Sequence, residues 1–329
     1  MLSRRTLLRQ AGVLAVAGGG LWLLRDRVLW PAPRPAFAPG KGGGSGWLDL
    51  APGVAVPVVD AMVNGERVRA LVDSGAQATV VDKELAQRLK LTDALSAPMI
   101  AFGVSGGPQT GRGARLEVTL GELTLPGLHA AALDLSPLGA LRGFGPPVAL
   151  VIGQDVLRTV LLDLDLPHDR LAFHPREGGR EPPGLRAVPA RSRGREQWTH
   201  VVVEGLALEV AVDTGLSSAL ALSEDLARQA GLLAEGRPVR RTRSVTLGGA
   251  SDGREVLAET LELGGHTLRR APVAVYPRGR ASLIPEGLLG SGAFRRTRAL
   301  LDLGAGRLLV GSPGVELRLE RRASVVASE

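Results

Sequence analysis

The chain contains one unit twice, and this repeat limits its possible folds more than any other feature of the sequence. Residues 63–81, VNGERVRALVDSGAQATVV, align without a gap with residues 203–221, VEGLALEVAVDTGLSSALA. The alignment pairs Asp73 with Asp213, and each begins a D-[ST]-G triplet. Self-similarity of this kind indicates a tandem duplication, so we expect two equivalent lobes in one chain.

The two units also match at their far ends. Residues 151–173, VIGQDVLRTVLLDLDLPHDRLAF, match residues 288–310, LLGSGAFRRTRALLDLGAGRLLV, with Gly153 opposite Gly290. The offset between the copies is nearly the same at both ends of the unit. The last part of each copy has the pattern of a hairpin, a strand followed by a turn and a second strand.

Within each unit, short apolar strands alternate with Gly-containing turns, and a short helix follows the triplet. The 44 Gly and 22 Pro residues show no period of three, so they indicate many turns and not a collagen-like chain. Asp82 and Ser223 precede the two expected helices and suit the N-cap position. The sequence therefore predicts a mainly β protein with one or two short helices per lobe.

Composition excludes several kinds of chemistry. The chain has no Cys, which excludes disulfides, thiolate metal sites and Cys nucleophiles. Its 5 His residues show no paired spacing typical of a metal site, so we expect neither metal nor cofactor. The net charge is +7, but the Arg residues are scattered and lack interleaved aromatic residues. We therefore favour solvated Arg over a nucleic-acid or membrane surface.

The first residues have the pattern of an export signal. SRRTLL at residues 3–8 resembles the twin-arginine signal, and an apolar run at residues 11–24 has the length of a signal core. Ala36-Phe37-Ala38 fits an A-x-A cleavage site, although an uncleaved anchor in the inner membrane remains an alternative. Either way, we expect a periplasmic or otherwise extracytoplasmic protein.

The expected domain organisation follows from the repeat and from composition. A segment rich in Gly, Pro and Arg separates the copies and is typical of a linker. The expected parts are a signal or anchor with a Gly/Pro-rich linker (1–46), an N-terminal lobe (47–176), an interlobe linker (177–198), a C-terminal lobe (199–315) and a tail (316–329).

A single D-[ST]-G triplet is most simply a turn, but two equivalent triplets can build one site. If the lobes pack about a pseudo-twofold axis, Asp73 and Asp213 face each other. Two carboxyls about 3 Å apart share a proton and titrate as a coupled pair. The ionised member can take a proton from water while the protonated member polarises a carbonyl. Such a pair can hydrolyse an amide bond.

The residues after each Asp can support this pair. Gly75 and Gly215 permit a tight turn and a close approach of the backbone. The hydroxyls of Ser74 and Thr214 can tie the two loops together.

These motifs resemble the aspartic proteases. Asp-Ser-Gly-Ala and Asp-Thr-Gly are each followed downstream by an apolar-apolar-Gly sequence, at residues 151–153 and 288–290. The resemblance is closest to bacterial retropepsin-like proteins. It implies a two-lobed, pepsin-like acid protease fold made of two tandem retropepsin-like β-barrel lobes. It also implies an endopeptidase that cleaves a peptide or protein substrate and is complete as a monomer.

The resemblance further implies glycine-rich hairpin flaps over the substrate. The candidate flap segments contain Gly103, Ser105 and Gly106 in the first unit, and Gly248 and Gly249 in the second. Plain surface hairpins are an equally good interpretation of these segments.

The second unit departs from the family pattern. Leu216 follows its triplet where the first unit has Ala76, and a Leu there could crowd the dyad. Ala219 stands where the first unit has Thr79. A non-catalytic peptide-binding or envelope scaffold protein with the same fold is therefore the alternative function.

Two further Asp residues repeat between the units. Asp163 and Asp302 precede the terminal hairpins, and we expect them to cap turns or to accept hydrogen bonds from backbone amides.

Overall fold

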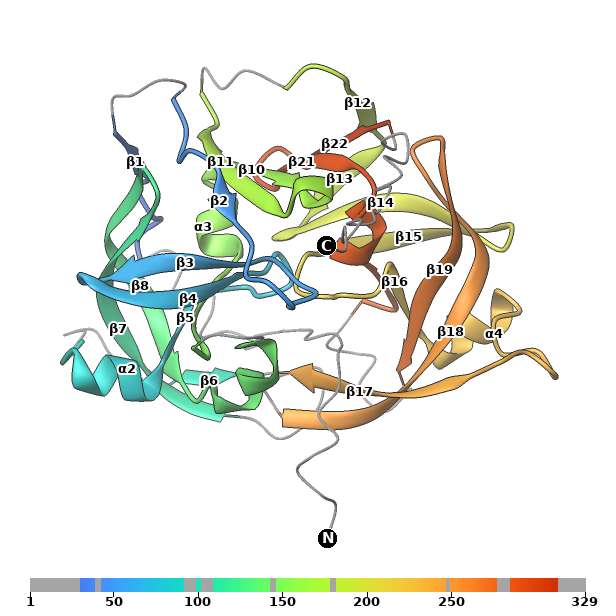
Figure 1. Cartoon of the computed structure of the whole chain (residues 1–329), viewed down its shortest axis with the longest axis horizontal. Coiled ribbons are helices and arrows are strands. Elements are labelled where there is room, and N and C mark those ends of the chain that lie inside the picture. Colours follow the sequence, from blue (N-terminus) through green and yellow to red (C-terminus); the bar gives the residue numbers. More distant parts are fainter. Residues whose placement is uncertain are drawn as a thin grey trace, which may run out of the picture.

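The computed structural model describes residues 30–38, 43–91, 99–101, 109–142, 146–177, 182–246, 249–276 and 285–312. Three β-sheets make up most of this part of the chain (Figure 1). Each repeat unit builds one eight-stranded sheet, and strands from both units share a third, six-stranded sheet between them. The mainly β, two-lobed architecture that the repeat predicts is confirmed.

The first sheet has the order β1-β8-β5-β9-β4-β3-β7-β6. Its strands are β1 (Ala36–Phe37), β3 (Val58–Val63), β4 (Glu66–Val72), β5 (Val80–Asp82), β6 (Met99–Ala101), β7 (Gln109–Leu120), β8 (Leu123–Leu133) and β9 (Val148–Ile152). The D-S-G triplet connects β4 to β5. Strand β9 runs parallel to β4 and antiparallel to β5, so it lies between the two strands that flank the triplet.

The second sheet repeats this arrangement in the order β13-β14-β15-β20-β16-β19-β18-β17. Its strands are β13 (Ala190–Arg193), β14 (Glu196–Val203), β15 (Leu206–Asp213), β16 (Leu220–Ser223), β17 (Arg240–Thr246), β18 (Gly249–Leu263), β19 (His266–Tyr276) and β20 (Gly287–Gly290). Strand β20 runs parallel to β15 and antiparallel to β16, as β9 does with β4 and β5. The topology therefore shows the same duplication as the sequence.

The third sheet joins the two lobes. It has the order β12-β22-β21-β10-β11-β2. Its strands are β2 (Leu48–Asp49), β10 (Val160–Asp165), β11 (Arg170–Pro175), β12 (Leu185–Val188), β21 (Arg298–Asp302) and β22 (Arg307–Gly311). The two repeated terminal hairpins are β10–β11 and β21–β22, and they pair along β10 and β21. In Figure 1 this sheet lies between the N-terminal and C-terminal lobes.

The helices are short. They are α2 (Lys83–Arg88), α3 (Gln154–Leu157), α4 (Glu224–Gln229), and the 3-10 helices η2 (Ser136–Arg142), η3 (Leu166–His168) and η5 (Ser291–Phe294). As predicted, Asp82 caps α2 by accepting from the amides of Glu84 and Leu85, and Ser223 caps α4. Leu, Val and Ala residues from both lobes form one continuous core, with Phe173 and Phe294 as its largest fully buried side chains.

Two of the expected segments contain strands that composition did not predict. Strand β1 lies in residues 1–46, and it pairs with β8. Strands β12 and β13 lie in residues 177–198, the expected linker. These are short edge strands, held by backbone pairing, so their sequences need no apolar alternation. The expected signal at residues 3–24 and the tail at 316–329 lie outside the described residues.

Reciprocal ion pairs connect the lobes across the third sheet. Asp163, in the first unit, is fully buried and accepts from Arg298 Nε and Nη2 of the second unit at 2.8 and 2.6 Å. Asp302, in the second unit, accepts from Arg176 Nε of the first unit at 3.0 Å. Burial alone would raise the pKa of Asp163, but Arg298 and His174 outweigh this effect and hold it below its ordinary value.

The sequence predicted that Asp163 and Asp302 cap turns or accept from backbone amides, and this is confirmed for Asp302. Asp302 Oδ1 accepts from the amide of Ala305 at 2.9 Å, as a turn-capping residue does. The hydrogen-bond partners of Asp163 are side chains, those of Arg298 and His174. Asp163 therefore acts between the lobes.

Replacing Arg298 with Met is expected to lower the free energy of unfolding by roughly 3 kcal/mol, because it removes the main partner of a buried carboxylate. The matched control is Arg67→Met, whose side chain is 74% exposed and pairs with Asp60 at the surface. Surface ion pairs contribute little, so this control should barely change stability. Equal losses for both variants in urea denaturation would contradict the role of Arg298.

Candidate active site

The two D-[ST]-G loops hold their carboxyls in the same way. Asp73 follows β4 and Asp213 ends β15, and both side chains are buried. Asp73 Oδ1 accepts from the Gly75 amide at 2.8 Å, and Asp213 Oδ1 accepts from the Gly215 amide at 2.9 Å. Each carboxyl is thus oriented by the turn that follows it, before any contact with the other lobe.

Each glycine lies against the carboxyl of the opposite lobe. A Cβ atom added at Gly75 would lie 2.6 Å from Asp213 Cγ. A Cβ atom added at Gly215 would lie 2.6 Å from Asp73 Cγ. Only glycine fits at these two positions, because any side chain would overlap the facing carboxyl. This reciprocal contact brings Asp73 and Asp213 together about a pseudo-twofold axis.

In the described part of the chain, the second oxygen of each carboxyl has no hydrogen-bond donor. Among the described residues, neither Asp73 Oδ2 nor Asp213 Oδ2 accepts a hydrogen bond, although both atoms are buried. A buried carboxylate oxygen without a donor is costly. A proton shared by the pair satisfies both groups, since two ionised carboxylates have no hydrogen to donate to each other.

The electrostatics favour such a shared proton. Burial raises the pKa of Asp73 to about 7, although the hydrogen bond from the Gly75 amide acts in the opposite direction. Burial, and then the charge of Asp73, raise the pKa of Asp213 well above its ordinary value. The pair therefore binds a proton at a pH where an exposed Asp is ionised.

The hydroxyls of Ser74 and Thr214 tie the two loops together. The Ser74 amide donates to Thr214 Oγ1 at 2.9 Å, and the Thr214 amide donates to Ser74 Oγ at 3.0 Å. Each hydroxyl in turn donates to a carbonyl of the other lobe, Ser74 Oγ to Val212 at 2.9 Å and Thr214 Oγ1 to Val72 at 2.8 Å. All four bonds are buried, and together they set the spacing of the two Asp residues.

Residues 151–157 resemble the retropepsin segment that lies under the active-site loop, and two of them that were not predicted as site residues support the first loop. Gln154 Nε2 donates to the Ser74 carbonyl at 2.8 Å. Asp155 Oδ1 accepts from the Thr79 amide at 2.9 Å and from Thr79 Oγ1 at 2.8 Å. Both residues follow the repeated apolar-apolar-Gly sequence, and this position was the available signal for them.

The second loop does not repeat the contacts of Gln154 and Thr79. Ser291, which occupies the place of Gln154, donates its hydroxyl to the Leu216 carbonyl at 2.7 Å. Ala219 has no hydroxyl with which to repeat the contacts of Thr79. The drift of the second unit thus removes the contacts of Thr79 and leaves the hydrogen bond from the Gly215 amide to Asp213 in place.

Leu216 takes the backbone position of Ala76 and packs into an apolar cluster. The amides of Ala76 and Leu216 each donate to the carbonyl of their own Asp, at 3.3 and 3.2 Å. The cluster around Leu216 contains Ala211, Ala221 and Leu288, on the sheet face opposite the main core. Strand pairing places Ala221 opposite Leu288 as it places Val80 opposite Val151, one residue away from the ungapped alignment. The corresponding residues in the first unit are therefore Leu71, Ala76, Val80 and Val151.

The two clusters have their large and small side chains at different positions. Two positions that hold Leu71 and Val80 in the first unit hold Ala211 and Ala221 in the second. The added bulk of Leu216 therefore occupies space that smaller neighbours leave free, as close packing requires. The side chain of Leu216 is thus accommodated by the packing of its own lobe.

Most of the predicted flap residues lie outside the described residues. These are Gly103, Ser105, Gly106 and Gly248. Gly249 begins β18 and pairs with Thr246 across the β17–β18 hairpin. This hairpin of the second unit contacts η2 of the first unit, so it crosses between the lobes (Figure 1).

The described residues contain neither a cluster of metal ligands nor a membrane-spanning helix. Within them, no three His, Cys, Asp or Glu side chains are grouped as metal ligands would be. No helix in that part of the chain is long and apolar enough to cross a membrane.

Comparison with known proteins gives relatives for about a third of the chain. The UBA domain-containing protein Mud1 of Schizosaccharomyces pombe is 30% identical over 121 residues, which are 36% of this chain and 33% of Mud1. DNA damage-inducible protein 1 of Kluyveromyces lactis is 32% identical over 111 residues, 33% of this chain and 24% of that protein. The chain thus spans a third or less of the length of these curated relatives. None of them tests the bacterial origin that the resemblance implies.

Among solved structures, the aspartic proteinase from Irpex lacteus matches with a TM-score of 0.48 and 13% identity. The match covers 82% of this chain and 97% of that protein. The model of the aspartyl protease family matches residues 59–156 and 199–293, which include both triplets and more than half of the chain. The chain is therefore a member of the aspartyl protease family, with the two-lobed fold of pepsin-like and retropepsin-like enzymes.

Proposed function

We propose that this protein is an exported aspartic endopeptidase in which Asp73 and Asp213 activate a water molecule. The observation that carries the proposal is the reciprocal contact of Gly75 and Gly215 with the opposite carboxyls. It brings two buried acids to one point, each with an oxygen that accepts nothing from the described protein. Family membership supports the same reaction class.

The proposed reaction uses a dyad that holds one proton. The ionised carboxyl takes a proton from water, and the water oxygen attacks the peptide carbonyl carbon. The protonated carboxyl donates its proton to the carbonyl oxygen, which gives a neutral tetrahedral intermediate. When the C–N bond breaks, the amine leaves with the proton that came from water and the intermediate returns one hydroxyl proton. The dyad then again holds one proton, and because the pair is coupled, neither role belongs permanently to one Asp.

The proposed substrate is a peptide or protein bound between the lobes. Both triplets belong to one chain, so a monomer supplies a complete dyad. The export-type N-terminus supports a periplasmic or other extracytoplasmic location, with membrane association as an option if the leader is kept. No cofactor and no nucleic-acid partner are part of this proposal.

The alternative, a non-catalytic protein with this fold, rested on Leu216 and on the drift of the second unit. The smaller side chains of Ala211 and Ala221 weaken that argument, since they account for a Leu at position 216 by packing alone. The lost supporting contacts around Ala219 leave the Asp213–Gly215 hydrogen bond in place. We therefore favour the enzyme.

Replacing either dyad residue is expected to abolish cleavage. Asp73→Asn and Asp213→Asn should each lower the turnover of a peptide library by roughly 10³-fold or more, because neither retains a singly protonated pair. Cleavage should be followed from acidic to neutral pH. Asp49→Asn, at an exposed end of β2, is the control and should keep wild-type turnover. Activity that survives both dyad substitutions would refute this mechanism.

Asp73→Asn should stabilise the protein, and the size of this gain should depend on pH. The unfolded chain releases the Asp73 proton near pH 3.9, whereas the folded protein holds it to about pH 7. Wild-type stability attributable to this group is therefore present at low pH and is lost as the pH rises through that window.

Asp73→Asn removes this dependence, so its gain in unfolding free energy over wild type should grow from pH 4 to pH 7, up to a few kcal/mol. Urea denaturation at three pH values within that range measures it. A gain that is constant, or that shrinks as the pH rises, would show that Asp73 is not held protonated by the fold.

The variant Leu216→Ala tests whether Leu216 fills space in its apolar cluster or obstructs the dyad. The truncation leaves a cavity and should cost about 2–4 kcal/mol of stability. Adding Ala211→Leu and Ala221→Val, which restores the side chains of the first unit, should recover much of that loss. If Leu216→Ala instead raises turnover tenfold with no loss of stability, then Leu216 obstructs the dyad and the alternative function gains support.

A further inference from the structure

The segment of residues 30–38, which we call the strap, packs on the first lobe. Trp30 is 7% exposed and belongs to the same apolar cluster as Ala76 and Val58. Its ring lies 6.1 Å from that of His129, measured between centroids. A tryptophan buried to this degree is part of a packed interior and not of a disordered leader.

The strap also extends the first sheet. Ala36 and Phe37 form β1, which pairs antiparallel with Thr124 and Leu123 of β8. The Ala38 amide donates to the Glu122 carbonyl at 2.9 Å. Phe37 packs against the main core. The strap is therefore anchored at both ends, by an aromatic side chain at Trp30 and by strand pairing at Phe37.

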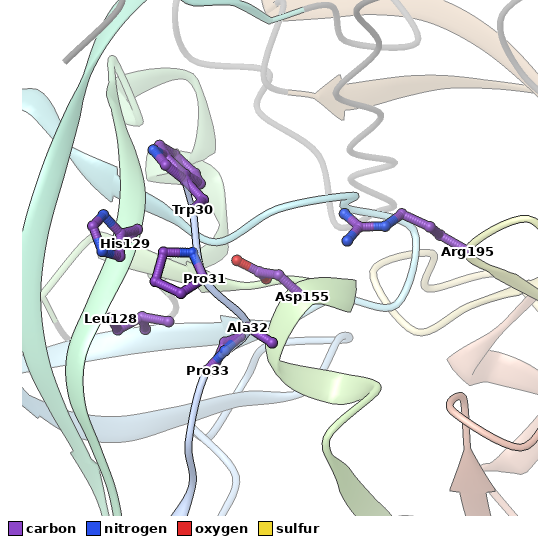
Figure 2. A pocket seen from close by; sticks show the side chains of 8 residues that line it. All are labelled: Trp30, Pro31, Ala32, Pro33, Leu128, His129, Asp155 and Arg195. Carbon is purple, nitrogen blue, oxygen red and sulfur yellow. The ribbon is translucent and has the colours of Figure 1, made fainter. Parts of the chain in front are cut away.

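Between these anchors the strap passes beside Asp155, which lines the same pocket. In Figure 2, Trp30 to Pro33 run between His129 and Leu128 on one side and Asp155 on the other. The space left among them is a pocket of about 70 Å³, with Arg195 on its wall, which has room for only a few water molecules. Asp155 is the residue that binds the amide and hydroxyl of Thr79. The strap therefore lines the same pocket as Asp155, the residue that supports the active-site loop through Thr79.

These contacts conflict with cleavage at Ala36-Phe37-Ala38. Cleavage after Ala38 would remove β1 together with the buried ring of Trp30, and it would open the wall of the pocket beside Asp155. We propose that the strap is a permanent part of the folded protein, and that any processing of the leader ends at or before Trp30. The processing part of this inference rests on the proposed export, whereas the structural part does not.

The position of processing can be measured on the full chain. The chain is expressed with its leader in a bacterium that has a twin-arginine pathway, in the Asp73→Asn background so that its own proposed activity does not trim it. Intact-mass spectrometry of the recovered protein gives its N-terminus. We expect residue 30 or an earlier residue, including an uncleaved chain. An N-terminus after residue 30, at Pro39 for example, would overturn the inference.

The structural part is tested by two variants of the full chain. Trp30→Ala should lower the melting temperature by several degrees, because it empties a buried site. Arg34→Ala, at an exposed position in the same strap, should leave it unchanged. If Trp30→Ala gives no soluble protein, Trp30→Phe should show a smaller loss. A melting temperature unchanged by substitution at Trp30 would refute the role of the strap.

These measurements separate the inference from the proposed function. Failure of export would show that the proposed location is wrong, while the Trp30 and Arg34 pair still decides whether the strap belongs to the fold. Failure of catalysis would affect neither result, since neither readout is an activity.

Discussion

The structure depends on a contact in which each lobe supplies a glycine to the carboxyl of the other. Gly75 and Gly215 leave room for Asp213 and Asp73, and the hydroxyls of the intervening residues cross between the loops. The arrangement needs two copies of the triplet, since a single loop has no opposite carboxyl to accommodate. Gene duplication within one chain therefore produces the site and the interface between the lobes in one step.

Other interlobe features keep this contact in register. Strands β10 and β21 pair between the units, and Asp163 and Asp302 each bind an Arg from the other unit. A shift of one lobe against the other would break these buried ion pairs. The dyad itself is destabilising when ionised, because burial raises the pKa of both acids. The sheet and the ion pairs supply the stability that the dyad region lacks, a common division between a scaffold and its active site.

Much of the fold and of the site could be predicted from the sequence, because the repeat carries both. Aligning the copies identified Asp73 and Asp213 as equivalent, and the pseudo-twofold argument then predicted that they meet. The short helices were predictable from their N-cap residues, since capping is a local interaction.

Other features were not predictable, for physical reasons. The hairpins β10–β11 and β21–β22 have the same local pattern whether they stay in their own lobes or join in a shared sheet. Strands β1 and β12 are short edge strands whose backbone pairing leaves little trace in sequence. The consequence of Leu216 depended on Ala211 and Ala221, and these become its neighbours only after the sheet has formed.

The central claim is that the two lobes bury one pair of acids that share a proton. Its most direct measurement is a comparison of potentiometric proton titrations for the folded wild type and the Asp73→Asn/Asp213→Asn variant. The account predicts that wild type retains at least one additional bound proton between pH 5 and 6, where isolated Asp residues are ionised. Titration curves that coincide over this range would mean that both acids are ionised, and they would contradict a shared proton.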